Sequence, residues 1–317
     1  MIDTIKGYLD IKPKENSNFK ELISEAKIST SDSGYTASLN LSNMKITFIL
    51  NENYKPYKLY FNGSLSKFHF GNNLLHLNRK TIKEAVNMLS DNINVNMKKA
   101  ILTRVDYGYN IEVDYSVHEY ISSLISFPRL ETNRYKDSVT FFTKWASKSL
   151  IFYDKIKELK NGNKEVFYSI PIEYHNKNIL RYEIRLKKNL KQRFNLEQVY
   201  LKSLFDDTVQ NKLKELWLKD YHKVNKLSIG KDPVHLLYRH SGLYQYLSYH
   251  GIDKLGFDKV INIISDLDFD VINPRSKRSK MKSVVKELLK EVSKNTLEKN
   301  LVRELDIKIR SVKDLIF

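Results

Sequence analysis

Residues 148–159 change their hydrophobic period part-way along, and this change limits what the surrounding chain can fold into. Residues up to Asp154 form a strand-like run, and from there the apolar spacing is helical. Tyr153 therefore lies at the end of a predicted strand, where side chains tend to face a cleft and not a core. The sequence thus predicts a phenol at the edge of a functional cleft.

Two further strand-like segments alternate and carry charges on one face. In residues 102–108 that face has Arg104 and Asp106, and in residues 180–187 it has Arg181, Glu183, Arg185 and Lys187. A solvated sheet face laced with salt bridges would give the same pattern. Alternatively, the carboxylates hold a divalent metal and the arginines neutralise phosphate oxygens.

The order of elements predicts an α+β fold, mostly antiparallel sheet with interleaved helices, followed by a helical C-terminal region. We expect residues 62–73 to form a polar loop, residues 165–174 a strand, and residues 225–233 a linker. The expected domains are residues 1–225 and residues 231–317.

The charge balance predicts a polyanionic partner. The chain has 54 Lys and Arg against 37 Asp and Glu, a net charge of +17. An AT-rich genome also enriches lysine, so part of the excess has a compositional explanation. The absence of cysteine excludes disulfides, thiolate-zinc sites and cysteine nucleophiles. No apolar run is long enough for a signal peptide or a spanning helix, so we expect a soluble protein of the cytoplasm.

Several catalytic signatures are missing from the sequence. It has no Walker loop, no Gly-x-Gly-x-x-Gly fingerprint, no nucleophile elbow and no zinc-ligand spacing. These absences argue against nucleotide hydrolysis and dinucleotide redox chemistry. Tyr153 is one of 20 tyrosines, so its surroundings, and not its residue type, make it a candidate nucleophile.

Four blocks carry a resemblance to a known family. Residues 64–73 match Ser-x-x-Lys-x-x-x-Gly-x-Asn, residues 104–106 match Arg-hydrophobic-Asp, residues 153–158 match Tyr-x-Lys-x-x-Glu, and residues 180–187 match hydrophobic-Arg-aromatic-Glu-x-Arg-hydrophobic-Lys. In this order, the blocks resemble the replication initiators of filamentous phages, the gene-two endonuclease family of rolling-circle replication. The resemblance covers about residues 1–195.

The resemblance implies a DNA-nicking and -joining enzyme in which Tyr153 is the nucleophile. Tyr153 would become linked to the 5′ phosphate at a replication origin, and the freed 3′ hydroxyl would prime synthesis. The first predicted domain would then be catalytic. In the second hypothesis, the chain is a non-enzymatic origin- or operator-binding protein.

The catalytic and metal roles are assigned to a small set of side chains. We expect Asp106 and Glu183, with Glu158, to hold Mg²⁺ or Mn²⁺. The phosphate oxygens would be neutralised by Arg104, Arg181 and Lys155.

Two features of the chain depart from the family pattern. Phage members have a histidine where this chain has Asn72, and the His-hydrophobic-His metal motif of the wider relaxase group is absent. His69 and His76 stay weak site candidates.

Residues 274–282 form a basic cluster between two predicted helices, which is typical of a solvated loop or of a contact to the phosphate backbone. We favour the second interpretation in so basic a chain. The residues predicted to contact DNA are Lys67, Asn73, Arg185, Lys187, Arg275, Lys277, Arg278 and Lys280.

The expected partners are the origin duplex and its single strand, with a host helicase as a further candidate and no membrane. The protein would act in the cytoplasm of a bacterial host as a monomer or a homodimer. The sequence leaves open the origin sequence, the metal, and whether a phage or a plasmid carries the gene.

Overall fold

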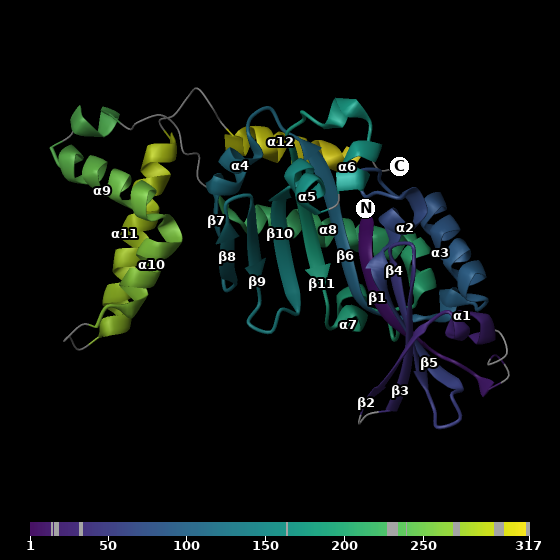
Figure 1. Cartoon of the computed structure of the whole chain (residues 1–317). Helices are drawn as coiled ribbons and strands as arrows, with labels where there is room; N and C mark the ends of the chain where they lie inside the picture. The colour runs from purple at the N-terminus through teal and green to yellow at the C-terminus, as the bar shows by residue number, and fades with distance from the viewer. Residues whose placement is uncertain are drawn as a thin grey trace.

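The fold is an α+β arrangement built on a large antiparallel sheet (Figure 1). The structure is a computed structural model and describes residues 1–13, 15, 19–31, 34–162, 164–226, 234–238, 240–268, 273–294 and 301–314. The strands are β1 (Ile2–Asp10), β2 (Lys27–Ser31), β3 (Gly34–Leu41), β4 (Met44–Leu50), β5 (Pro56–Ser64), β6 (Ile101–Glu112), β7 (Leu124–Ser126), β8 (Glu131–Tyr135), β9 (Ser138–Phe142), β10 (Lys148–Asp154), β11 (Ile179–Leu186) and β12 (Asn225–Lys226).

Helices are interleaved with these strands and dominate the second half of the chain. The α-helices are α1 (Lys20–Ser24), α2 (Leu65–Phe70), α3 (Arg79–Ile93), α4 (Val117–Ser123), α5 (Lys155–Gly162), α6 (Lys164–Ser169), α7 (Leu190–Phe194), α8 (Asp207–Lys223), α9 (Gly242–Leu255), α10 (Phe257–Asp266), α11 (Pro274–Lys294) and α12 (Leu301–Asp314). Short 3₁₀ helices are η2 (Met97–Lys99), η3 (Ile172–Tyr174), η4 (Leu201–Phe205) and η5 (Val234–Tyr238). The predicted α+β class is confirmed. No described helix is both long and apolar enough to cross a bilayer.

Within the described residues, ten strands form one sheet in the order β2-β3-β4-β5-β1-β6-β11-β10-β9-β8. The N-terminal strand β1 lies in the middle, between β5 and β6. The predicted strands with paired charges, β6 and β11, are neighbours, and β11 also pairs with β10. The pairing therefore places the three charged or tyrosine-bearing strands side by side.

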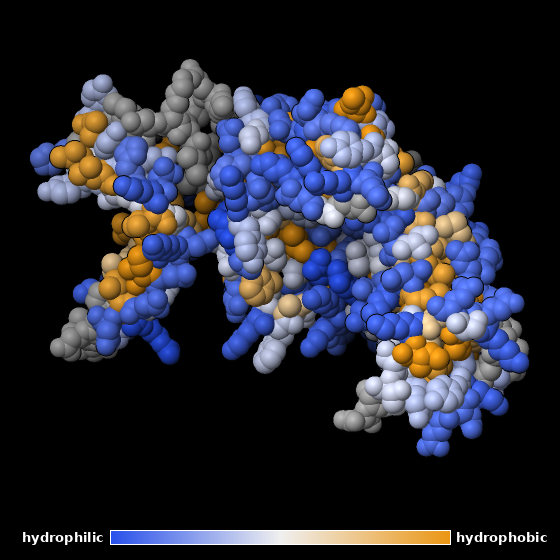
Figure 2. Space-filling view, viewed as in Figure 1, coloured by the Kyte–Doolittle hydropathy of each residue, from blue (hydrophilic) through white to orange (hydrophobic). Residues whose placement is uncertain are grey.

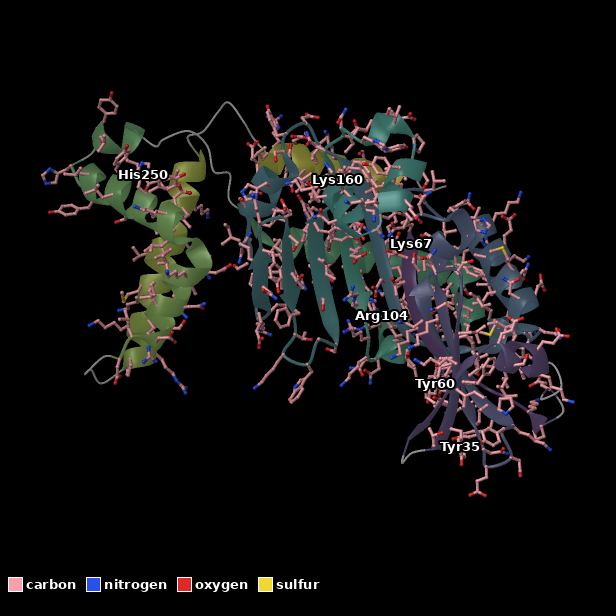
Figure 3. The ribbon with its side chains drawn as sticks, viewed as in Figure 1. Tyr35, Tyr60, Lys67, Arg104, Lys160 and His250 are labelled. Atoms are coloured by element: carbon pink, nitrogen blue, oxygen red, sulfur yellow. The ribbon has the colours of Figure 1, made fainter. Side chains whose placement is uncertain are left out.

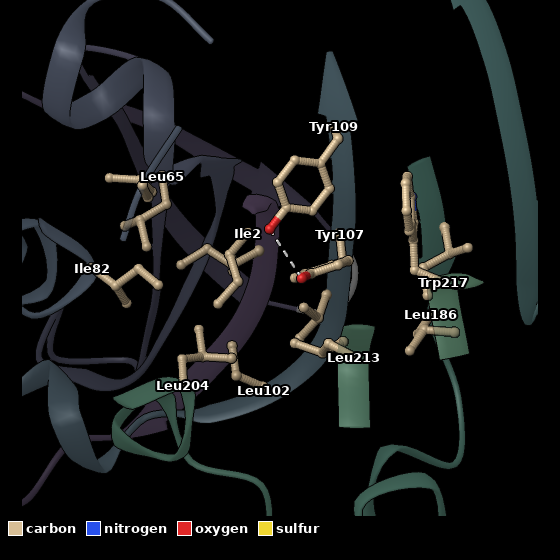
Figure 4. Packing of buried hydrophobic residues seen from close by; sticks show 14 of the residues in the cluster. Ile2, Leu65, Ile82, Leu102, Tyr107, Tyr109, Leu186, Leu204, Leu213 and Trp217 are labelled. Atoms are coloured by element: carbon tan, nitrogen blue, oxygen red, sulfur yellow. Dashed lines mark hydrogen bonds between the residues drawn. The ribbon is translucent and has the colours of Figure 1, made fainter. Parts of the chain in front are cut away.

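One face of the sheet is packed against helices. Trp217 of α8 stacks on Tyr182 of β11, and Tyr182 in turn stacks on Phe152 of β10. The same layer contains Tyr107 and Tyr109 of β6, whose hydroxyls lie 3.2 Å apart (Figure 4). Because side chains alternate along a strand, the polar residues of β6, β10 and β11 must face the other way. Helices α7 and α8 lie behind these strands in Figure 1. We call the opposite face the open face, although α5 contacts β10 and β11, and Arg181 and Asp106 on this face are buried.

Helices end and begin where local chemistry dictates. Asn78 caps α3 by accepting from the Thr81 backbone N–H, as its position before the apolar stripe predicts. Asp206 caps α8 by accepting from the Thr208 backbone N–H. A sharp boundary between strand and helix at Asp154 is confirmed, because β10 ends there and α5 begins at Lys155.

Three local predictions are wrong. Residues 165–174 form α6 and η3 in place of a strand, and Phe167 and Ile170 are buried in a small helical cluster with Leu159. Residues 62–73 are the end of β5 followed by α2, which Ser64 caps. The basic residues 274–282 open helix α11 and do not form a loop. Helix propensity and tertiary packing override the weak short-range patterns in each case.

The described helices after residue 233 pack in two groups. Helices α9 and α11 share an apolar cluster with Ile125 of β7, through Tyr249, Ile252 and Leu289 among others. Helix α12 instead joins the main core through three buried residues, Leu301, Leu305 and Ile309. The two-domain division stays a prediction, but α12 packs with the first part. Of the expected linker, Asn225 and Lys226 form β12, and residues 227–233 lie outside the described residues.

Candidate active site

The open face of the sheet carries a cross-strand row that begins with the candidate nucleophile. Tyr153 of β10 lies opposite Arg181 of β11, and Arg181 lies opposite Asn110 of β6. Directly paired residues in an antiparallel sheet point to the same face. The sheet therefore brings together a phenol, a guanidinium and an amide from three segments of the chain.

Arg181 joins this row to the first strand. Its side chain is 0% exposed, and its Nη2 donates to Asp3 Oδ2 at 2.5 Å. Its Nη1 donates to Asn110 Oδ1 at 2.9 Å, and its Nε donates to Glu183 Oε2 at 3.3 Å. A buried guanidinium with carboxylates on two sides is held in one orientation.

In the next two cross-strand rows, Glu183 lies opposite Gly108 and Arg185 lies opposite Asp106, so carboxylates and guanidinium groups continue to alternate. Arg185 donates from Nε to Asp106 Oδ2 at 2.9 Å, and its Nη2 lies 3.7 Å from Glu183 Oε1. Arg104 makes a bidentate contact with both carboxylate oxygens of Asp106. The order across the face is therefore Asp3, Arg181, Glu183, Arg185, Asp106 and Arg104, which we call the ion ladder.

Gly108 makes the middle of the ion ladder possible. It lies opposite Glu183, and a Cβ at this position would be 2.5 Å from Glu183 Cβ and 2.7 Å from Tyr182 O. A side chain cannot be accommodated there without moving β11. A glycine inside a strand commonly marks such a close approach.

Burial and neighbouring charges shift the pKa values of Glu183 and Asp3. Burial raises the pKa of Glu183, and Asp3 and Asp106 add to the shift, while Arg181 opposes it. Burial would also raise the pKa of Asp3, but Arg181, Ser64 and Asn73 outweigh it and lower that pKa. The pKa values of the two acids that flank Arg181 are therefore shifted in opposite directions.

Tyr153 is half-buried at the end of this face. Burial raises its pKa well above the ordinary value of 10.0, with Glu183 and Glu158 adding to the rise and Arg181 opposing it. Attack on phosphorus requires loss of the phenol proton, so nearby cations are needed to favour the phenolate. Arg181 is one such cation, and Lys155 Nζ is another, 6.0 Å from the centre of the Tyr153 ring.

Lys155 is buried at the first turn of α5. Its side chain is 0% exposed, and its Nζ donates to Glu158 Oε2 at 2.5 Å. Burial lowers the pKa of Lys155 to about 8, and Glu158 opposes that fall. The Tyr-x-Lys-x-x-Glu spacing is thus realised as a strand end followed by one helical turn.

The predicted metal ligands offer oxygen donors of the kind that Mg²⁺ and Mn²⁺ take. Asp106 and Glu183 lie on neighbouring strands on either side of Arg185. Glu158 lies apart from them and pairs with Lys155. Among the described residues, no three acidic or histidine side chains are arranged as a metal site. The donor types fit a divalent ion, and such an ion would take the place of arginine contacts.

The predicted DNA contacts lie in different environments. Arg185 is 28% exposed, and Lys187 is exposed beside it at the end of β11. Lys67 is half-buried on α2, whereas Asn73 is only 4% exposed and donates from Nδ2 to Asp3 at 3.3 Å. Asn73 is therefore a buried residue that contacts the ion ladder through Asp3, and its placement does not fit a surface contact to DNA.

The basic cluster near residue 275 lies far along the chain, on α11. Arg275, Lys277 and Lys280 are exposed, and the Arg278 Nε donates to Leu267 O at 2.9 Å. The cluster is thus a helix face, with Arg278 tying α11 to the end of α10. Figure 1 shows α9, α10 and α11 beside the β8 edge of the sheet and away from β11.

The two histidine candidates are not part of the ion ladder. His69 on α2 lies 3.8 Å from Glu84, and the His76 ring packs edge-on against Tyr109. Both contacts are what structural side chains make.

Sequence reasoning assigned no site role to Asp3, Asn110 or Ser64, although Ser64 opens the first matched block. Asp3 lies before any recognisable motif, and its role exists only because β1 enters the sheet beside β6. Ser64 contacts Asp3 through its hydroxyl. A carboxylate in an otherwise apolar strand start, Met1-Ile2-Asp3, was the one available signal.

A family model that describes the N-terminal part of a phage replication-associated protein, the gene-two protein, matches residues 1–203. The chain belongs to this family. The match covers the whole ion ladder and Tyr153, and it confirms the family that the four sequence blocks predict: the chain is a member of the rolling-circle replication initiators.

Two other comparisons concern solved structures and curated sequences. A solved structure titled "Structure of Rolling Circle Replication Initiator Protein from Geobacillus stearothermophilus" aligns with a TM-score of 0.38 and 10% identity. The alignment covers 71% of this chain and 84% of that one. No curated protein sequence matches the chain.

Proposed function

We propose that this initiator nicks and rejoins one DNA strand at a replication origin through a phosphotyrosine intermediate. The observation that carries the proposal is the cross-strand row in which Tyr153 lies opposite the buried Arg181. The nucleophile and a fixed cation thus share one face of the sheet. A phosphodiester is an anion, and a guanidinium beside it stabilises the charge that develops on its oxygens.

In the proposed reaction, the Tyr153 oxygen attacks the scissile phosphorus and the bond to the 3′ oxygen breaks. The phenol loses its proton, the 3′ oxygen gains one, and Tyr153 carries the 5′ phosphate. Rejoining is the reverse, with a 3′ hydroxyl attacking the phosphotyrosine. The number of phosphoester bonds is unchanged, so no nucleotide hydrolysis is needed.

The other side chains have supporting roles in the proposal. Arg181 and Lys155 favour the phenolate and neutralise the phosphate, and Arg104 and Arg185 extend the positive face beyond them. Mg²⁺ or Mn²⁺, held by Asp106 and Glu183 with Glu158 as a further ligand, would polarise the scissile phosphate. The partner is DNA, as duplex origin and as single strand.

The test is incubation with supercoiled plasmid that carries the native origin, in the presence of Mn²⁺. We expect relaxed circles and a covalent adduct whose peptide, identified by mass spectrometry, contains Tyr153. Tyr153→Phe should abolish both products and keep origin binding, because it removes one hydroxyl and retains the ring. Tyr135→Phe is the matched control, since Tyr135 belongs to the same cross-strand row through Ser138.

Undiminished nicking by Tyr153→Phe would eliminate Tyr153 as the nucleophile. Specific retention of origin DNA without any relaxed circles or adduct would favour the alternative, a non-enzymatic origin-binding protein.

A further inference from the structure

The open face of the sheet does not end at the ion ladder. Lys6 of β1 lies opposite Arg104 of β6 on one side and opposite Asn62 of β5 on the other. Two residues further along β1, Tyr8 lies opposite Tyr60 of β5. Because Lys6 and Tyr8 are two residues apart on a strand, they share a face. The face that carries Arg104 therefore continues onto a pair of tyrosines.

A basic row separates the ladder from these tyrosines. Burial is the largest cause of the lowered pKa of Lys187. The nearby positive charges of Arg185, Arg104 and Lys6 lower that pKa further. In the part of the chain that the structure describes, neither Lys6 nor Lys187 forms an ion pair with a carboxylate. Lys6 and Lys187, which have no compensating acid, leave this row with positive charge that attracts the phosphates of a nucleic-acid strand, whereas Arg104 is paired with Asp106.

The tyrosine pair itself is open to solvent on the sheet surface. Tyr60 is 38% exposed and Tyr8 is half-buried, with ring centres 6.0 Å apart. Lys58 Nζ lies 4.5 Å from the centre of the Tyr8 ring and 3.3 Å from Asp10 Oδ1. Neither tyrosine hydroxyl has a hydrogen-bond partner among the described residues. We call Tyr8, Tyr60 and Lys58 the tyrosine platform.

The platform is continuous with the site. Figure 3 shows Lys67, Arg104 and Tyr60 following one another down the molecule, and in Figure 2 hydrophilic side chains gather on the open face below α5 and α6. Along β6, the six steps from Asn110 to Arg104 span about 20 Å at the usual rise of a strand. Single-stranded DNA must therefore extend over several nucleotides to reach from Tyr153 to the platform.

We propose that the tyrosine platform stacks the bases of single-stranded DNA that runs from the site across the basic row Lys187, Arg104 and Lys6. The inference rests on the proposed function for its choice of strand. Exposed aromatic rings beside a positively charged surface are the combination with which proteins hold single strands. Duplex DNA keeps its bases stacked on each other, so its bases cannot use the rings. The platform therefore fits an unpaired strand.

The test compares two probes of equal length, a 20-nucleotide oligothymidylate and the same chain without bases, by fluorescence anisotropy. The variant is Tyr8→Leu with Tyr60→Leu in the full chain. We expect affinity for oligothymidylate to fall about 10-fold or more, as for the loss of base stacking. Affinity for the base-free chain, and the salt dependence of binding, should not change, because no cation is removed.

Two controls separate stacking from general damage. Tyr8→Phe with Tyr60→Phe should bind oligothymidylate like the natural protein, since stacking needs the ring and not the hydroxyl. Tyr244→Leu removes a tyrosine that is 78% exposed on α9, outside the platform, and should leave both affinities unchanged. An equal loss on both probes, or no loss on oligothymidylate, would overturn the proposal and leave the pair a sheet-packing contact.

A second measurement does not depend on the folding of the variants. Photocrosslinking of the unaltered protein to an oligonucleotide with 5-iodouracil should label peptides that contain Tyr8 or Tyr60, and labelling confined to other peptides overturns the proposal. A duplex that competes as well as the single strand at the platform would also overturn it. These results are independent of nicking, so a failure of Tyr153 as nucleophile and a failure of the platform can be told apart.

Discussion

Arg181 donates a hydrogen bond of 2.5 Å to Asp3, a residue 178 positions earlier in the chain, and both side chains are buried. This contact ties the first strand to the strand that carries most of the candidate site. It also fixes the guanidinium that lies opposite Tyr153. The stability of the sheet centre and the geometry of the site therefore depend on the same pair.

Asp3→Asn should destabilise the protein by about 3–5 kcal/mol, because it removes the charged partner of a fully buried guanidinium. Chemical denaturation measures the change. Asp10→Asn is the control on the same strand, where an exposed carboxylate pairs with Lys58 and about 0–1 kcal/mol is expected. The two variants losing equal stability would contradict a special role for Asp3.

The same variant has a pH signature. The pKa of Asp3 is lowered in the folded protein, so its contribution is present above the unfolded value near 4 and is lost as pH falls through the lowered pKa. The stability difference between the natural protein and Asp3→Asn should thus shrink in acid. A difference that stays constant down to pH 2 would argue that the effect is steric.

Asp106→Asn and Glu183→Gln should each reduce nicking at least about 100-fold and weaken Mn²⁺ binding, if these carboxylates hold the ion. Titration calorimetry with Mn²⁺ and single-turnover nicking are the measurements. Glu112→Gln, which alters an exposed carboxylate at the end of β6, is the control. Loss of stability with an unchanged Mn²⁺ dependence would assign both residues to salt bridges alone.

Nicking should fall as pH rises through about 8, because Lys155 loses its charge there. Glu158 opposes the lowering of that pKa, so Glu158→Gln should move the fall to lower pH. The single-turnover rate between pH 6 and 9 gives the midpoint for each protein. Lys157→Gln changes an exposed neighbour on the same helix and should not move it. An unmoved midpoint in Glu158→Gln would mean that Lys155 does not set the profile.

Replacing residues 227–300 by a short Gly-Ser linker should weaken duplex origin binding and leave nicking of a single-stranded origin oligonucleotide. Lys226 Nζ lies 3.5 Å from Asp306 Oδ1, so the residue before the deletion is close to α12. A short linker can therefore join the two and leave α12 packed on the core. Loss of single-strand nicking from a folded deletion protein would show that α9 to α11 also serve the catalytic part.

The basic face of α11 can be tested without a deletion. Changing Arg275, Lys277 and Lys280 to Ser should reduce the salt dependence of duplex binding. The slope of log K against log salt concentration should become shallower by about 1 for each phosphate that is no longer neutralised. Arg278 is kept because it holds Leu267. The control with the same charge change replaces three exposed lysines of α1 and α3, Lys20, Lys80 and Lys83. An equal effect from both triple variants would reflect net charge alone.

The sequence by itself determined the faces of the central strands and the boundary between strand and helix at Asp154. A period of two is a property of neighbouring residues, so the sequence shows directly the alternation in β6 and β11 and the change to a helix after Asp154. Short sequence motifs, with Arg-x-Asp, Tyr-x-Lys-x-x-Glu and Arg-x-Glu spacings, also indicated the chemistry of the candidate site. These blocks predicted the family that the match over residues 1–203 shows.

Tertiary structure alone decided which strands are neighbours and which charges meet. Alternation assigns a side chain to a face but not to a partner strand, so nothing local indicates that Asp3 lies against Arg181 or that Arg185 joins Asp106 and Glu183. The same holds for α12, whose apolar stripe could cover any apolar surface and packs on the main core. Residues 165–174 became helical because burying Phe167 and Ile170 beside α5 outweighs a weak strand pattern. Long-range packing free energy, and not local propensity, selects among the arrangements that the local pattern permits.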